Sequence, residues 1–146
     1  MAGSSECDVW AVGSGATVLR RDCDGNWTRV DLVAAGVISP QDVRTFEEGD
    51  LFSVASAARD DVWIEDRSGK LLHFDGASWS TEMAPGRGML IAVAKGELYL
   101  GTSTGLFHRT AAGREQVSSL SKQGIMQISA SSPNDVWVLA ADGVAC

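Results

Sequence analysis

The chain has 146 residues, of which 45% are hydrophobic and 21% are charged, and this fits one globular domain rather than a disordered segment. Its formal net charge of −7 at pH 7 argues against nucleic acid or an anionic membrane surface as a partner. No stretch reaches the roughly 18 apolar residues that a membrane span needs, and we identify no signal peptide at the N-terminus.

A block of an acidic, an apolar and an aromatic residue occurs four times along the chain. The four copies are Asp8–Trp10, Asp61–Trp63, Glu97–Tyr99 and Asp135–Trp137. The last three aromatic residues follow one another at intervals of 36 and 38 residues, whereas the first interval is 53 residues. A period of about 40 residues is typical of a repeat protein.

Each repeat contains further short runs that favour β-strands. An apolar run precedes the aromatic block at 51–55 and 125–129, and another run follows it at 17–21, 70–74 and 105–109. An Asp-Gly turn then leads to Trp27 in the first repeat and to Trp79 in the second. Gly, Asp and Ser separate the runs, and no helical period lies between them. Four strands in about 40 residues predict the blade of a β-propeller.

The predicted architecture is all-β, a partial β-propeller of about three and a half four-stranded antiparallel blades. The blades are expected at about 1–32, 51–84 and 88–121, with an incomplete fourth at about 124–146 and a connector at 33–50. We expect aromatic side chains to fill the gaps between sheets, since one ring buries ~150–250 Å². These blade anchors are Trp10, Trp63, Tyr99, Trp137, Trp27 and Trp79.

The end blades fall short of the full repeat. We therefore expect either a segment of a longer propeller or copies of the chain that join around a ring. Open blade edges leave unpaired strands and apolar faces, which favours self-association in both cases.

The blocks resemble repeats of known bacterial proteins. Asp8-Val9-Trp10-Ala11-Val12-Gly13 and the Asp-Gly turns are similar to propeller repeats of secreted and surface proteins, which are grouped with Asp-box, or sialidase-like, repeats. In a true Asp box one residue separates Asp from Gly, whereas in this chain the two residues are adjacent. The run 97–106 also resembles sensory propellers attached to two-component regulators.

The resemblance implies a propeller fold, and because the residues show no catalytic constellation we expect a non-enzymatic scaffold that binds a protein or carbohydrate ligand. It also implies that the full-length protein is secreted or lies at the cell surface. The alternatives are a sensory module of a bacterial signalling protein and a degenerate sialidase-like glycoside hydrolase.

The residues reveal no catalytic constellation, and we predict neither a cofactor nor a metal site. Residues 101–105 match the Gly-x-Ser-x-Gly nucleophile pattern, but a strand follows them, which favours a hairpin turn. The run 22–25 begins like a calcium loop and lacks the closing Glu. His73 and His108 occupy equivalent places in two repeats, without ligands at zinc spacing, and we interpret both as structural.

The connector is the longest insertion in the repeat pattern. Ser39 and Pro40 resemble a helix start, and both one short helical turn and an extended loop are compatible with the sequence. Inserted loops often carry specific contacts, so we hypothesise a binding loop here, the alternative being a solvated connector. Its candidate residues are Gln41, Arg44, Glu47 and Glu48.

Two of the three cysteines flank the first predicted hairpin. If this hairpin is centred on Gly15, opposed residue numbers add up to 30, which places Cys7 opposite Cys23. We hypothesise that the pair forms a disulfide in an exported protein. The alternative is two reduced thiols near a blade rim.

Overall fold

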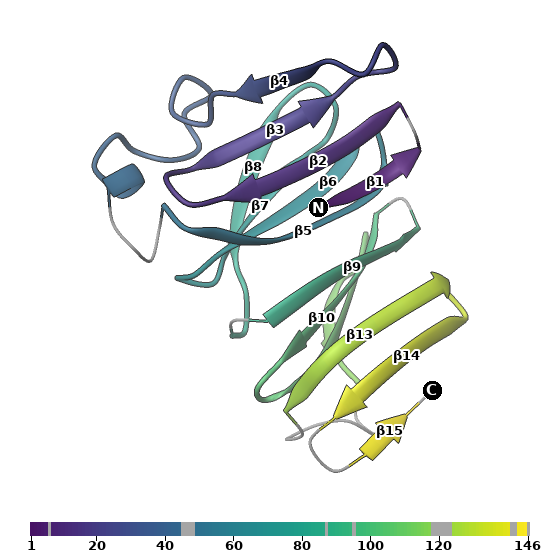
Figure 1. The fold of residues 1–146 in the computed structure, drawn as a ribbon. Coiled ribbons are helices and arrows are strands. Elements are labelled where there is room, and N and C mark those ends of the chain that lie inside the picture. The colour runs from purple at the N-terminus through teal and green to yellow at the C-terminus, as the bar shows by residue number, and fades with distance from the viewer. Residues whose placement is uncertain are drawn as a thin grey trace.

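The computed structural model describes residues 1–5, 7–44, 49–86, 88–94, 96–117, 124–140 and 143–145. These residues form short β-strands and one 3₁₀ turn (Figure 1). In chain order the elements are β1 (Ala2–Ser5), β2 (Asp8–Gly13), β3 (Thr17–Arg21), β4 (Trp27–Val30), η1 (Asp42–Arg44), β5 (Leu51–Ala58), β6 (Asp61–Asp66), β7 (Lys70–Phe74), β8 (Trp79–Met83), β9 (Gly88–Ala94), β10 (Glu97–Thr102), β11 (Gly105–Thr110), β12 (Gly113–Gln116), β13 (Ile125–Ser132), β14 (Asp135–Ala140) and β15 (Gly143–Ala145).

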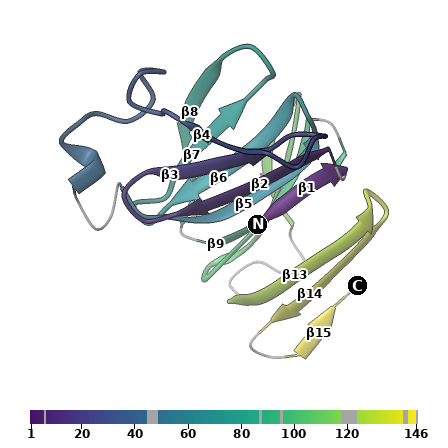
Figure 2. The same ribbon diagram turned by 45° about the horizontal axis from the view of Figure 1, so that its top comes forward.

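The strands of the described residues make four antiparallel sheets in which neighbours in sequence are neighbours in space. Sheet 1 has the order β1-β2-β3-β4, sheet 2 β5-β6-β7-β8 and sheet 3 β9-β10-β11-β12, while sheet 4 contains β13-β14-β15. The first strands of consecutive sheets lie side by side, β1 with β5, β5 with β9 and β9 with β13 (Figures 1 and 2). This is the arrangement of consecutive blades around a propeller axis.

Apolar side chains pack between each pair of consecutive sheets. Trp10 and Val18 of sheet 1 share one cluster with Val62, Ile64 and Leu72 of sheet 2. The next two gaps are filled by Trp63 and Leu71 against Leu98 and Leu100, and by Leu106 against Ile125 and Val138. The core is therefore a series of layers between sheets, and each sheet depends on the next for its burial.

Strand burial follows from this layering. Every residue of β6 is buried, because sheets 1 and 3 cover both of its faces. Trp137 was expected to fill a gap between sheets, but it is 50% exposed, and Leu139 on the same strand is 38% exposed. In the part of the chain that the structure describes, sheet 3 covers one face of β14 and no sheet covers the other.

Trp27 also departs from its expected role as a blade anchor. It begins β4, the outer edge strand of sheet 1, and is 45% exposed. Its counterpart Trp79 begins β8 and reaches inward, with its ring centroid 5.1 Å from that of Phe74 and 6.3 Å from that of Trp10. An outer-strand Trp is thus covered only where a neighbouring sheet presents an aromatic ring to it.

The connector packs onto sheets 1 and 2 through a few apolar residues. Leu32, the residue before the connector, and Ile38 within it are 1% and 3% exposed and belong to the cluster between these two sheets. Ser39 and Asp42 then cap the 3₁₀ turn η1 reciprocally: the Ser39 amide donates to Asp42 Oδ2 and the Asp42 amide donates to Ser39 Oγ, each at 3.2 Å. Of the two alternatives, the structure has the short helical turn.

No described helix is long and apolar enough to cross a membrane.

Candidate functional site

The repeated acidic and aromatic residues form a cluster on the second strand of each sheet. In sheet 1, Asp8 Oδ1 accepts hydrogen bonds from Trp10 Nε1 at 3.2 Å and from Arg20 Nε at 3.0 Å. The Arg20 guanidinium also lies over the Trp10 ring. We call each set of acid, aromatic residue and Arg or His an interblade cluster, because its aromatic ring packs against the next sheet. Trp10, for example, contacts Phe74 and Trp79 of sheet 2.

The second interblade cluster shows how the acid joins two sheets. Asp61 Oδ1 lies 3.0 Å from Trp63 Nε1 and 2.8 Å from His73 Nε2, and the His73 ring stacks on Trp63 at 4.0 Å. Its Oδ2 accepts the Gly96 amide at 2.6 Å, from the turn that opens β10 in sheet 3. Burial raises the pKa of Asp61, but the hydrogen bonds from His73, Gly96 and Trp63 outweigh it and hold the pKa below its usual range.

The third cluster replaces Asp and Trp by Glu97 and Tyr99. The Tyr99 and His108 rings stack at 4.3 Å, and His108 Nε2 lies 3.5 Å from Glu97. Burial, and then the charges of Glu97 and Glu115, raise the pKa of Tyr99, which keeps its phenol protonated. Both histidines therefore lie in packing clusters, each stacked on the aromatic residue of its sheet.

The motifs that suggested chemistry form turns. Thr102 pairs with Gly105 across the β10–β11 hairpin, and Thr102 Oγ1 donates to the Gly105 carbonyl at 3.1 Å, so the Gly-x-Ser-x-Gly run is a hairpin turn as predicted. Asp22 Oδ1 accepts the amides of Asp24 and Asn26, each at 2.9 Å. Among the described residues, no three His, Cys, Asp or Glu side chains are grouped to hold a metal ion.

The Asp-Gly turn of sheet 2 is held by its own carboxylate. Asp75 Oδ1 accepts the amides of Ser78 at 2.7 Å and Ala77 at 2.9 Å, and Oδ2 accepts Ser78 Oγ. These bonds, led by the Ser78 amide, lower the pKa of Asp75 to about 2. Gly76 supplies the positive φ of 94° that lets the chain enter β8.

The hypothesised binding loop has a cavity at its tip. Pro40, Gln41 and Arg44 line a hollow of about 220 Å³, and all three residues are exposed. The structure thus brings two of the predicted binding residues together, Gln41 just before η1 and Arg44 at its end. Glu47 and Glu48, the other two, lie outside the described residues.

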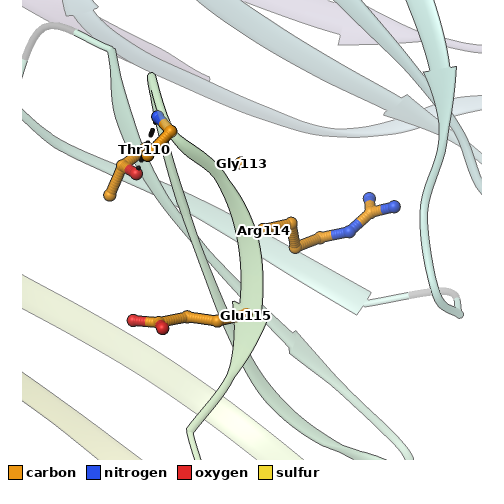
Figure 3. A pocket seen from close by; sticks show the side chains of 5 residues that line it. Thr110, Gly113, Arg114 and Glu115 are labelled. Carbon is orange, nitrogen blue, oxygen red and sulfur yellow. Dashed lines mark hydrogen bonds between the residues drawn. The ribbon is translucent and has the colours of Figure 1, made fainter.

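A second cavity, of about 200 Å³, was not predicted from the sequence. It is lined at the β11–β12 hairpin by Thr110, Ala112, Gly113, Arg114 and Glu115 (Figure 3). Arg114 extends to sheet 2, where Nη1 donates to the Met83 carbonyl at 3.0 Å, while Glu115 points the opposite way. The guanidinium therefore serves a contact between sheets, and no sequence signal marks the hollow.

Two exposed apolar residues also escaped the sequence analysis. Phe52 on β5 and Met126 on β13 are 40% and 64% exposed and follow the equivalent residues Leu51 and Ile125. The repeat alignment could have identified them, because an apolar residue recurs in it directly after the first buried residue of the inner strand.

The cysteine pair lies at the open end of the first hairpin. In β2 and β3 the residue numbers of opposed partners add up to 30, as in Trp10 with Arg20, which is the predicted register. Cys7 and Cys23 lie just beyond these strands, with Cα atoms 3.9 Å apart and their sulfur atoms joined as a disulfide.

Comparison with solved structures identifies the same fold elsewhere. The chain superposes with a TM-score of 0.64 on YCF48 bound to D1 peptide (19% identity, 96% of this chain and 46% of that one) and on YCF48 from Cyanidioschyzon merolae (18%, 100% and 51%). It superposes equally on selenomethionine-substituted virginiamycin B lyase from Staphylococcus aureus (11%, 98% and 52%). The fold is a partial β-propeller.

The chain spans about half the length of these propellers. No protein-family model matches the sequence, and no curated protein matches it.

Proposed function

We propose that the chain is a non-enzymatic propeller scaffold that binds a segment of another protein at the connector. The observation that carries this proposal is the exposed Gln41 and Arg44 around the cavity of about 220 Å³. Leu32 and Ile38 are buried in the core, so the segment that leads to η1 is held in place before a ligand arrives. The guanidinium and amide offer donors for the carbonyls and carboxylates of a peptide.

One structural neighbour supports a peptide rather than a carbohydrate as the ligand. YCF48 is a propeller of the same fold bound to a peptide. Carbohydrate binding remains the competing outcome of the experiment below.

The non-enzymatic part of the proposal is supported by how the titratable groups are used. Asp8, Asp61 and His73 hold aromatic rings between sheets, and their side chains are largely enclosed. Groups enclosed in this way are poorly placed to meet a substrate. Turnover of any fluorogenic glycoside by the purified chain would contradict this part.

We further propose that the chain belongs to the bacterial Asp-box-like or regulator type of propeller and works outside the cell or at its surface. The Asp75 turn and its carboxylate-held amides support the first point, and the Cys7–Cys23 disulfide supports the second. The sensory alternative has the 97–106 repeat in its favour and would be supported if the same gene encoded a kinase or a transmembrane segment. We also propose that the chain self-associates through its uncovered sheet face.

Panning a random phage-displayed peptide library on the intact chain tests the binding proposal. We expect enriched peptides whose affinity, by fluorescence polarisation, falls about tenfold or more in Arg44→Ala. Arg29→Ala, an exposed Arg on β4, is the matched control and should not change it. Loss of binding in Phe52→Ser with Arg44→Ala unaffected would contradict the assigned site. Binding on a glycan array without any enriched peptide would contradict the assigned ligand.

A further inference from the structure

The fourth sheet has the acid and the aromatic residue of an interblade cluster, without a described Arg or His partner, and the indole is half exposed. Asp135 Oδ1 accepts Trp137 Nε1 at 2.8 Å, and Asp135 Oδ2 accepts the Ser131 hydroxyl. Asp61 and Trp63 make the same hydrogen bond, yet Trp63 is 1% exposed and Trp137 is 50% exposed. The two clusters differ in what lies against the indole, so Trp63 shows what kind of surface fits Trp137.

Sheet 3 covers Trp63 with two aliphatic residues and a cation. Leu98 and Leu100 are 1% and 2% exposed in the same cluster as Trp63. The Arg109 guanidinium lies over the indole, 4.3 Å from its centroid. Such cation–π contacts strengthen when the partners are removed from water. The surface that covers the Trp63 cluster therefore has two apolar side chains on its second strand and an Arg on its third.

Sheet 1 presents this same pattern on the face that sheet 2 does not cover. In sheet 3, Leu98 pairs with Arg109, and in sheet 1 the equivalent pair is Val9 with Arg21. Ala11 and Leu19 occupy the next pair of positions, matching Leu100 and Phe107. Because side chains alternate along a strand, these residues face away from Trp10 and sheet 2. All four are partly exposed. We call Val9, Ala11, Leu19 and Arg21 the receiving face.

We propose that a second copy of the chain covers Trp137 with its receiving face, so that Arg21 of one copy stacks on Trp137 of the other. The proposal rests on the proposed self-association and specifies its contact. Complementarity between a cation and an aromatic ring supports it, since Arg21 would lie over the exposed indole of Trp137 as Arg109 lies over that of Trp63. The size of the solved propellers supports it too, because this chain spans 46–52% of their length and two copies would equal one of them.

Two copies related by a twofold axis would make this contact twice. Each copy contributes one Trp137 face and one receiving face, so a closed pair leaves neither face uncovered. The contact is head-to-tail, between two different surfaces, and this property separates it from association through identical edges.

Sedimentation of the purified full chain tests the contact. We expect the wild type to reach twice 15.4 kDa with rising concentration. Trp137→Ala and Arg21→Glu should each weaken association about 30-fold or more, as loss of a central interface Trp or Arg does. Trp137→Phe should retain most of the association, and Met83→Ala, which removes an exposed apolar side chain from the edge strand β8 of sheet 2, should not alter it. Far-UV circular dichroism confirms that each variant is folded.

Mixing the two defective variants gives the decisive result. Trp137→Ala retains a receiving face and Arg21→Glu retains Trp137, so a mixed pair regains one intact contact and should associate more strongly than either variant alone. A wild type that stays at 15.4 kDa throughout would overturn both this contact and the proposed self-association. A dimer that survives Trp137→Ala, or a mixture that does not recover, would overturn this contact alone. Peptide binding at Arg44 is measured separately and is unaffected by either outcome.

Discussion

At the scale of single residues, large side chains buried between sheets contribute much of the protein's stability. Trp63 is almost fully buried against sheet 3, and its indole is fixed by Asp61, His73 and Arg109 at once. Trp137 has the same sequence context but half of its surface is exposed. The two Trp residues thus contribute different amounts to the free energy of unfolding, because the burial of each side chain, rather than its sequence motif, determines that contribution.

Replacing these two residues measures that difference. We expect Trp63→Ala to lower the free energy of unfolding by about 3–5 kcal/mol, from lost burial and the cavity left behind. Trp137→Ala should cost less than about 1 kcal/mol at concentrations where the chain is monomeric. Urea denaturation followed by circular dichroism provides both values. Equal losses for the two variants would contradict the layered core.

The carboxylates predict how stability changes with acid. The pKa of Asp61 lies below its usual range, and that of Asp75 is about 2, against 3.8 for an ordinary Asp. A folded-state pKa below the unfolded value stabilises the protein above the unfolded pKa, and this contribution is lost as pH falls through the folded one. Stability should therefore decline between about pH 4 and pH 2.

Urea midpoints measured from pH 6 to pH 2 test this expectation. Asp75→Asn should flatten the decline, because the group that takes up a proton on unfolding is gone. Asp24→Asn, in the corresponding turn of sheet 1, is the control. A wild-type midpoint that does not move below pH 4 would contradict the role of these carboxylates.

At the scale of elements, local patterns predicted strands and turns well. The repeated apolar runs predicted the strands. The position of Gly15 predicted the register of β2 with β3, since a hairpin turn fixes which residues oppose each other. Burial of Trp27 and Trp137 could not be predicted in this way, because it depends on whether another sheet lies against them. The hollow at the β11–β12 hairpin could not be predicted either, since the residues that line it form no recognisable motif.

The β2–β3 hairpin carries a prediction of its own. Cys7 and Cys23 close a loop with a sequence separation of 16 residues, so the disulfide should stabilise the chain by about 3 kcal/mol. Adding reductant should lower the urea midpoint of the wild type and leave that of the Cys7→Ser, Cys23→Ser double variant unchanged. Three free thiols in the unfolded, unreduced protein would contradict the disulfide.

At the scale of the whole molecule, four sheets share one principle of assembly. Each sheet presents the aromatic residue of its repeat on one face, and sheets 2, 3 and 4 each pack against the ring of the sheet before, so that each interface stabilises the two sheets that it joins. Because this chain spans about half the length of the solved propellers, its first and fourth sheets each have one uncovered face within the described residues. The repeat pattern predicted the sheets, but it did not predict which face of each sheet a neighbouring sheet covers.

Hydrogen exchange of the five indole N–H groups, followed by ¹⁵N NMR, tests this principle most directly. The indoles of Trp10 and Trp63 donate to carboxylates of almost fully buried aspartates and should exchange orders of magnitude more slowly than that of Trp27. Trp137 should join the slow group only at concentrations where copies associate. Exchange at Trp10 and Trp63 as fast as at Trp27 would contradict the stacking of sheets around these rings.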